Sequence, residues 1–249
     1  MQLNVKIEKI SFGTSIQDIV VPDILKRKIP SGLEYFDAAL GGKGFTPSAV
    51  TLFTGMAGAG KTTIMLALAD AIQGNGGTCI FNTAEESLYQ IKLTSDRLRL
   101  RNRFLVGSED NVVKLLKGCT EVRSEYPERP FFLIVDSLQC MNDDYFKSGR
   151  ITHATSERSL QILTDYAKEY ACNIIVIGQV TKEGRMAGTN KLKHMIDAHI
   201  HLSIEEKDPE AIGVRLLETQ KNRFGGAGHI IYLDMSERGL VEIGRKTAS

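Results

Sequence analysis

Hydrophobic and polar residues follow a regular pattern from residue 49 to residue 179. Short continuous apolar runs, typical of strands buried on both faces, alternate with longer segments whose apolar residues recur at helical spacing. The predicted strands are 49–54, 78–83, 103–107, 131–137 and 173–179. The predicted helices are 61–73, 87–98, 111–122 and 157–170. Strands that alternate with helices predict an α/β fold, with a mainly parallel central sheet covered by helices on both faces.

The pattern changes beyond residue 197. Three strand-like runs, 198–204, 214–220 and 229–235, follow one another with short polar connections and no helical segment between them. Such runs predict a C-terminal antiparallel meander at one edge of the sheet. Residues 221–228 are then expected to form a tight turn between the last two runs.

The first 28 residues mix polar and apolar positions without a clear amphipathic helix. We expect residues 1–28 to form an arm and residues 29–249 to form one core domain. Directly after the arm, Ser31 is placed to cap a short helix. That helix would carry Leu33, Phe36 and Leu40 on one face and end at a pair of glycines.

Composition narrows the class of protein. A chain of 249 residues that is 42% hydrophobic can bury the core of an α/β domain. The net charge of +1 neither requires nor excludes a nucleic-acid partner, because binding depends on local basic patches. The four cysteines are scattered without a C-x-x-C pair, which argues against zinc. Without a long apolar run or a signal-peptide pattern, we expect a cytoplasmic protein that does not enter a membrane.

A glycine-rich segment carries the firmest chemical signal. "GMAGAGKT", residues 55–62, fits G-x-x-x-x-G-K-[ST] and lies between a predicted strand and a predicted helix. In such a P-loop, backbone amides and the helix N-terminus face phosphates, Lys61 reaches the β and γ oxygens, and the Thr62 hydroxyl binds Mg²⁺. The sequence therefore predicts ATP and Mg²⁺ as cofactors. The predicted nucleotide-binding residues are Gly55, Met56, Ala57, Gly58, Ala59, Gly60, Lys61, Thr62 and Thr63.

Carboxylates at strand ends are the next candidates. Asp136 ends the apolar run 131–135, where a carboxylate is costly without a metal or a hydrogen-bonding partner, so Thr62 and Asp136 are the predicted metal ligands. Ser137 is placed to assist through water. Glu85 and Glu86 follow another strand and are the first and second candidates for the catalytic base. A glutamate at the start of a helix is also favoured by the helix dipole, and spacing does not separate the two explanations.

The end of the predicted strand 173–179 is a candidate part of the nucleotide site, and the segment that follows it is a candidate DNA contact. The Gln179 amide lies at the same rim of the sheet and is placed to sense the γ-phosphate. Small residues and cations follow, as in a loop that grips a nucleic-acid backbone. The predicted DNA-contacting residues are Lys182, Arg185, Lys191 and Lys193. A solvated loop, its charge diluted by Glu183, explains the composition equally well.

Eight segments together resemble the ATPase core of the bacterial RadA (Sms) proteins in order and approximate spacing. "VTKEG" and "KNRFG" are more specific to that family than the Walker motifs, which the wider RecA, DnaB and KaiC group shares. The resemblance runs from about residue 29 to residue 243. The segments are 27–42, 55–63, 84–93, 134–139, 179–184, 192–197, 221–225 and 236–243.

The resemblance implies a RecA-type P-loop fold, ring formation, ATP hydrolysis, and helicase-like action on single-stranded DNA and branched recombination intermediates. It assigns the nucleotide and Mg²⁺ roles to Lys61, Thr62 and Asp136, and it makes Glu85 the catalytic carboxylate. Local reasoning leaves open whether the cations of "KNRFG" serve this chain's own site, a neighbour's site or neither. The resemblance makes Lys221 and Arg223 candidates that act across a subunit boundary on a neighbour's γ-phosphate.

The departures from the family limit what is carried over. RadA proteins begin with a four-cysteine zinc finger and end with a domain like that of Lon protease, and the resemblance includes neither. Position 179 is Gln, closer to RecA itself, where RadA usually has His. The DNA-binding and ring-assembly roles of the two appended domains are therefore not assigned to these residues.

The leading hypothesis is an ATP-dependent DNA motor or recombination and repair ATPase. It would bind single-stranded or branched DNA and hydrolyse ATP at the subunit interfaces of a homo-oligomer, with a hexameric ring favoured over a filament. A KaiC-like regulatory ATPase that acts through protein partners is one alternative. An accessory ATPase that loads a helicase is another. Stimulation by DNA discriminates the first hypothesis from the second, and oligomeric state discriminates it from the third.

Overall fold

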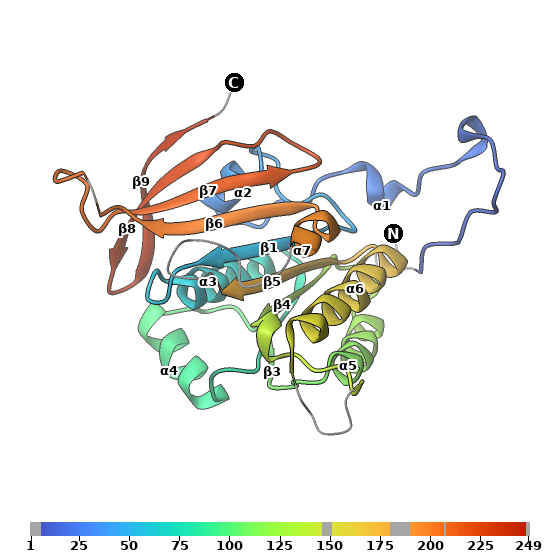
Figure 1. Cartoon of the computed structure of the whole chain (residues 1–249), viewed down its shortest axis with the longest axis horizontal. Helices are drawn as coiled ribbons and strands as arrows, with labels where there is room; N and C mark the ends of the chain where they lie inside the picture. The colour runs from blue at the N-terminus through green and yellow to red at the C-terminus, as the bar shows by residue number, and fades with distance from the viewer. Residues whose placement is uncertain (1–5, 146–150, 180–189, 207, 248–249) are drawn as a thin grey trace.

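The computed structural model describes residues 6–145, 151–179, 190–206 and 208–247. The described strands form one nine-stranded sheet in the order β3-β2-β4-β5-β1-β6-β7-β8-β9 (Figure 1). Pairing is parallel from β3 through to β6 and antiparallel from β6 to β9. The predicted α/β class, the mainly parallel sheet and the C-terminal antiparallel meander are confirmed.

The strands are β1 Val50–Gly55, β2 Thr78–Thr83, β3 Leu105–Gly107, β4 Phe131–Asp136, β5 Asn173–Gln179, β6 Ala198–Ile204, β7 Arg215–Asn222, β8 Ile230–Ser236 and β9 Gly239–Lys246. The α-helices are α1 Asp23–Lys26, α2 Glu34–Ala39, α3 Lys61–Gly74, α4 Leu88–Leu98, α5 Val112–Glu125, α6 His153–Tyr170 and α7 Asn190–Met195. Two short 3₁₀ turns are η1 Ile16–Asp18 and η2 Leu138–Cys140. In this described part of the chain, no helix is long and apolar enough to span a bilayer.

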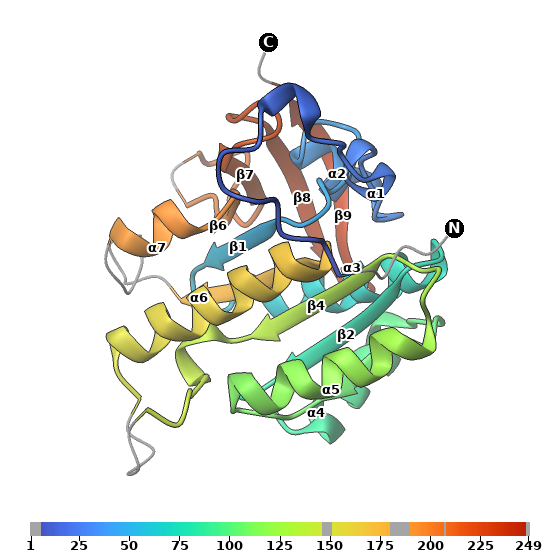
Figure 2. The same ribbon diagram turned by 90° about the vertical axis from the view of Figure 1, so that its right-hand side faces the viewer.

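The sheet separates two hydrophobic clusters. Neighbouring residues of a strand point to opposite faces, so Phe53 joins the cluster with α2, α3 and α4, while Leu52 joins the cluster with α5 and α6. Figure 2 shows α5 and α6 lying on the same face of the sheet. Burial on both faces explains why β1, β2 and β4 are continuous apolar or small-residue runs rather than alternating ones.

The meander is longer than its pattern predicts. β9 pairs antiparallel with β8, although half of its positions are exposed and its charged residues interrupt any apolar alternation in the sequence. The turn assigned to residues 221–228 is also wrong at its start, because Lys221 and Asn222 continue β7. Lys221 stands opposite His199 of β6. Residues 221–222 and β9 are extended because they pair with neighbouring strands, and such pairing produces no pattern in the local sequence.

Two local expectations are wrong. Ser31 does not cap α2: its hydroxyl accepts from the backbone N–H of Leu33 at 3.0 Å and forms a turn ahead of the helix. The Asp37 carboxylate of α2 reaches back to the Ser31 backbone N–H at 3.0 Å. The second is the loop expected over residues 180–194, which is wrong for residues 190–194 because they belong to α7; residues 180–189 lie outside the described residues.

Residues 6–22 of the arm extend away from the body in Figure 1. Its beginning contacts α6, where the Ile7 backbone N–H donates to the Glu169 carbonyl at 2.7 Å. Farther along, Phe12, Ile16 and Val20 are exposed. The arm therefore contacts the body near residue 7 and again at the buried Ile24 of α1, with an exposed apolar stretch between them.

Candidate functional site

The P-loop joins the carboxyl end of β1 to the start of α3. Gly58 and Gly60 adopt φ values of +77° and +104°, a left-handed region that strains other residues. A Cβ at Gly60 would lie 2.7 Å from the Met235 methyl group, so the loop packs closely against the β8–β9 hairpin. The loop curls toward the N-terminus of α3, as anion binding by backbone amides requires.

Lys61 lies over this loop. Its ammonium group donates to the carbonyl oxygens of Gly55 at 2.9 Å and Met56 at 3.0 Å. Burial lowers the pKa of Lys61, while the nearby carboxylates of Asp136 and Glu85 raise it. A cation held by neutral carbonyls at the mouth of a P-loop is well placed to transfer to phosphate oxygens.

Asp136 is the buried carboxylate of the site. The Thr62 hydroxyl donates to its Oδ2 at 3.2 Å, so the structure brings the two predicted metal ligands together. Burial raises the pKa of Asp136 to about 6, and the negative charge of Glu85 adds to that effect. Added positive charge would stabilise such a carboxylate, and hard oxygen ligands suit Mg²⁺. These residues fit a Mg²⁺–nucleotide complex.

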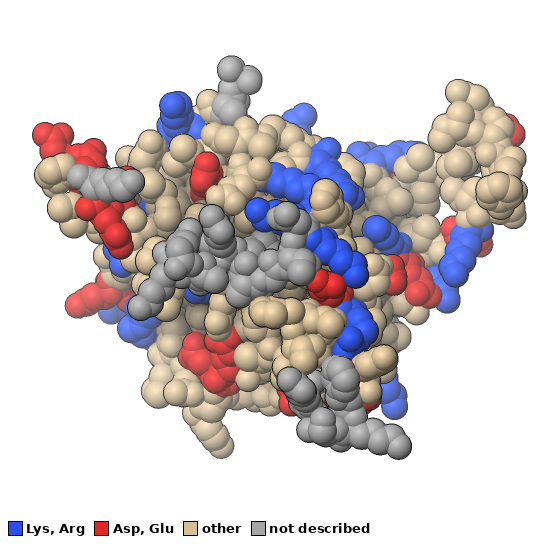
Figure 3. Space-filling view, viewed as in Figure 1, with Lys and Arg blue, Asp and Glu red and all other residues tan. Residues whose placement is uncertain are grey.

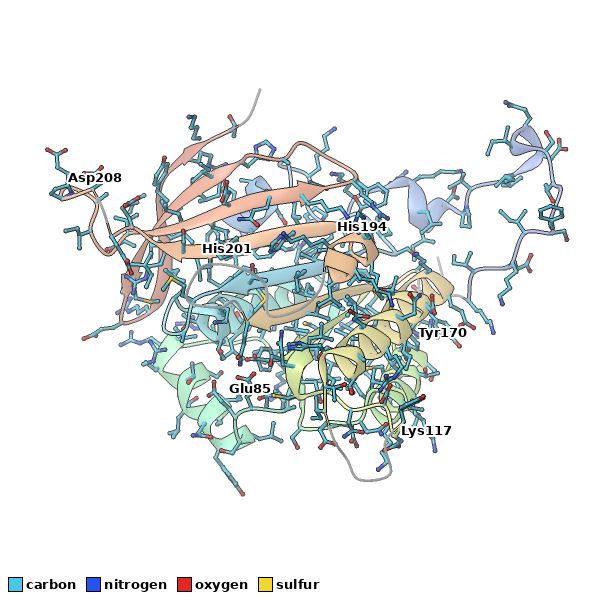
Figure 4. All side chains as sticks on the ribbon, in the orientation of Figure 1. Glu85, Lys117, Tyr170, His194, His201 and Asp208 are labelled. Atoms are coloured by element: carbon cyan, nitrogen blue, oxygen red, sulfur yellow. The ribbon has the colours of Figure 1, made fainter. Side chains whose placement is uncertain are left out.

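Glu85 is oriented by several donors. Its Oε1 accepts hydrogen bonds from the Ser137 hydroxyl, from Gln179 Nε2 at 3.0 Å and from Cys140 Sγ at 3.6 Å. The expected partner of the Gln179 amide is the γ-phosphate, and in this structure the amide contacts Glu85. Glu85, which Figure 4 labels, lies in the connection of residues 84–87 between β2 and α4. One carboxylate oxygen is thus fixed by donors from β5 and from the end of β4.

Glu86 has a different environment. Its backbone N–H donates to the Thr83 hydroxyl at 3.0 Å, which stabilises the turn after β2. Its side chain does not line the cavity beside the P-loop, whereas that of Glu85 does. The geometry therefore favours Glu85 over Glu86 as the group that contacts a bound ligand.

A cavity of about 510 Å³ connects these groups. Two residues without a sequence signal, Arg97 of α4 and Met235 of β8, complete its wall, because the tertiary fold brings both segments to the P-loop. Met56 and Ala59, predicted to bind nucleotide, lie outside the lining, and Ala59 is buried in the core. The lining residues are Gly55, Ala57, Gly58, Gly60, Lys61, Thr62, Thr63, Glu85, Arg97, Asp136, Ser137, Ile177, Gln179 and Met235.

The cations of "KNRFG" lie elsewhere. Lys221 Nζ donates to the carbonyls of Lys193 at 2.6 Å and Ile196 at 2.7 Å. Arg223 donates to the His194 carbonyl at 2.8 Å and forms an ion pair with Asp197 at 3.3 Å.

These contacts are at the amino end of the parallel strands, because Asp197 bonds to the first residue of β1. The P-loop follows the other end of β1, roughly 17 Å of strand away. The structure therefore does not bring Lys221 and Arg223 to the chain's own P-loop.

The predicted DNA contacts are only partly described. Lys182 and Arg185 lie outside the described residues. Lys191 forms an ion pair with Glu157 at 3.1 Å, and Lys193 is exposed on α7. Lysine and arginine side chains gather on the face that carries α7 (Figure 3), near the position of His194 in Figure 4.

A buried polar cluster lies beside the P-loop strand, and no motif or spacing in the sequence predicts it. The Thr54 hydroxyl is 2.7 Å from His199 Nε2 and 2.9 Å from His201 Nδ1. Burial lowers the pKa of His199 to about 4 and also lowers the pKa of His201. The cluster joins β1 to β6 through neutral imidazoles one residue before the P-loop begins.

Curated proteins similar to the chain include the DNA repair protein RadA of Aquifex aeolicus, with 32% identity over 219 residues. That match covers 88% of this chain and 47% of the relative. The DNA repair protein RadA of Bacillus subtilis is 29% identical over 241 residues, covering 94% of this chain and 50% of the relative. The chain thus spans about half the length of the curated relatives it matches. No protein-family model matches the sequence.

Among solved structures, the chain resembles one that is described as an ATPase domain. The TM-score is 0.74 at 13% identity, and the match covers 87% of this chain and 92% of that one. At this identity the likeness concerns the fold, and it confirms the expected RecA-type P-loop architecture. The resemblance to the RadA core is confirmed by the sequence matches, which cover nearly the whole chain.

The histidine cluster leads to a prediction about stability. Between pH 6.5 and pH 4 the unfolded chain binds a proton at His199 that the folded chain excludes, so the free energy of unfolding falls as pH falls. In urea unfolding, His199→Gln should lose about 2 kcal/mol less than the unaltered chain between pH 7.5 and pH 5.0. The control His153→Gln, at an exposed position of α6, should lose as much as the unaltered chain. Equal losses in all three proteins would contradict the prediction.

Proposed function

We propose that this chain is the ATP-hydrolysing core of a DNA motor that acts in repair or recombination. The observation that carries the proposal is the convergence of Lys61, Thr62, Asp136 and Glu85 on one cavity. Similarity to RadA proteins over 88% of the chain supports the DNA role. A regulatory ATPase shares the cavity but has no comparable support from the curated relatives.

The P-loop amides and Lys61 would hold the phosphates of ATP, and Thr62 and Asp136 would hold Mg²⁺. When bound, Mg²⁺ neutralises phosphate charge that develops during transfer. Asp136 gains most from that binding, because its buried carboxylate is paired with a single hydroxyl donor within the described site. Lys61 would exchange its two carbonyl partners for phosphate oxygens. Its ammonium group is already partly buried, so ATP binding would add little further desolvation cost.

Glu85 is the proposed general base. Its Oε1 is fixed by Ser137 and Gln179, so the carboxylate is held in one orientation toward the cavity that it lines. A positioned carboxylate can take a proton from an attacking water. Gln179 ends β5, immediately before residues 180–189, so a displacement of that segment would change the contact with Glu85. DNA binding by that segment would in this way be coupled to ATP hydrolysis at Glu85.

Lys221 and Arg223 are proposed to act on a neighbour's cavity. They are at the amino edge of the parallel strands, while the cavity is at the carboxyl edge, and a head-to-tail assembly brings unlike edges together. Among the described residues, Lys61 and Arg97 are the cations that line this cavity. Additional positive charge at the γ-phosphate would stabilise the transition state.

Lys191 and Lys193, on the same basic face, are proposed to contact the DNA backbone along with Lys182 and Arg185.

Substitution of the two glutamates tests the catalytic assignment. Glu85→Gln keeps the side-chain size but cannot accept a proton, so ATP turnover should fall roughly 10²- to 10⁴-fold. ATP affinity should change little. Glu86→Gln is the matched control and should retain most of the turnover. Steady-state phosphate release and equilibrium ATP binding measure both quantities, and the reverse pattern would assign the base to Glu86.

Single-stranded DNA should raise ATP turnover of the unaltered chain severalfold at low salt. The stimulation should weaken as salt rises, because phosphate contacts by lysine and arginine release counterions. A titration of DNA against phosphate release at several salt concentrations measures this effect. Turnover that stays constant at every DNA concentration would contradict the DNA role and favour a regulatory ATPase.

Complementation between two inactive variants tests action across subunits. Arg223→Ala should lower turnover roughly a thousandfold while leaving its cavity intact. Mixed with Glu85→Gln, whose Arg223 is intact, it should regain activity at on the order of a quarter of the interfaces in a random equimolar ring. Arg129→Ala, at an exposed loop position, is the control and should stay active alone. Mixtures as inactive as their components would show that Arg223 does not act in trans.

A further inference from the structure

The end of the cavity away from Glu85 is formed by two segments without a motif. Glu85 precedes α4, and Arg97 lies in the last turn of that helix, about 14 Å from its first residue. The β8–β9 hairpin meets this end of α4, where Arg97 Nη1 donates to the Glu237 carbonyl at 3.1 Å. The cavity thus has a carboxylate end and a guanidinium end.

The hairpin also contacts the P-loop helix. A Cβ built at Gly60 would be 2.7 Å from the Met235 methyl group and 3.3 Å from Leu240 Cδ1. A Cβ at Gly239 would be 3.2 Å from Leu98 of α4 and 3.7 Å from Thr63 of α3. Met235 and Arg97 are therefore held beside the same stretch, between the start of α3 and the end of α4.

We propose that Arg97 and Met235 form the nucleobase subsite, with a purine ring between the guanidinium plane and the thioether. This inference rests on the proposed function, because it takes the phosphates to lie at Lys61 and Thr62. A triphosphate whose terminal group is near Glu85 directs its nucleoside toward Arg97. The cavity volume of about 510 Å³ is within the range for small-ligand sites.

The chemistry of both side chains suits an aromatic base. Guanidinium groups stack on aromatic faces, and thioether sulfur makes favourable contacts with rings. The hydrogen bond to Glu237 restrains Arg97, so less conformational freedom is lost when a ligand binds. Stacking discriminates ring size rather than exocyclic groups. ATP and GTP should therefore bind with similar affinity, and CTP and UTP more weakly.

The experiment compares ATP with inorganic tripolyphosphate, which has the phosphates but no base. Binding with Mg²⁺ is measured by calorimetry in the Glu85→Gln protein, to prevent hydrolysis. Adding Arg97→Ala should weaken ATP binding roughly tenfold and change tripolyphosphate binding less than twofold. Met235→Ala should weaken ATP binding severalfold with the same selectivity. In the Arg97→Ala protein the preference for purine nucleotides should be lost.

Arg101→Ala provides the control, because Arg101 is an exposed arginine just beyond α4 that does not line the cavity. It should bind both ligands as the parent protein does. Equal weakening of ATP and tripolyphosphate by Arg97→Ala would make Arg97 a phosphate ligand and overturn the proposal. Unchanged binding of both would also overturn it. If the parent protein bound neither ligand, the proposed function itself would fail.

Discussion

The parallel register of β1, β5, β4 and β2 places the last residues of these strands at one edge of the sheet. This alignment brings together the P-loop, Asp136 and Gln179 although they are far apart in sequence. Their arrangement needs no long loops, because each polar group ends, or directly follows, a strand that is buried on both faces. The same burial deprives Asp136 of water and raises its pKa to about 6. The fold thus both assembles the site and leaves in it a buried carboxylate that positive charge would stabilise.

The electrostatics of the site follow from that burial. Asp136 and Glu85 repel each other, and Lys61 of the P-loop supplies compensating positive charge. On the other side of β1, the Thr54 cluster uses two imidazoles whose pKa values are lowered, so it connects the strands without further charge near neutral pH. A cation bound at the site would therefore be attracted by the carboxylates of Asp136 and Glu85, whose combined charge Lys61 only partly balances. The neighbouring histidine cluster would not repel it, because its imidazoles are uncharged near neutral pH.

The two ends of the parallel strands differ in character. The P-loop and the carboxylates of the site lie at the carboxyl end. Lys221 and Arg223 lie at the amino end, where they donate hydrogen bonds to backbone carbonyls of α7. The antiparallel extension explains this separation, because β7 runs back toward the start of β1 and ends there. The next hairpin returns β8 and β9 to the P-loop, where Met235 packs on Gly60. One meander therefore contributes to both edges of the domain.

Local sequence pattern determined much of the fold and many residues of the candidate site. Helical and strand periodicity predicted the βα alternation, and the spacing of glycine, lysine and threonine predicted the P-loop, because each depends on residues close in sequence. Only the tertiary structure showed that Glu85 rather than Glu86 lines the cavity, since both occupy the same turn. It also decided that Lys221 belongs to β7 and that Arg97 and Met235 meet beside Gly60. Those facts depend on strand pairing and on contacts between distant segments, which leave no periodic trace in the sequence.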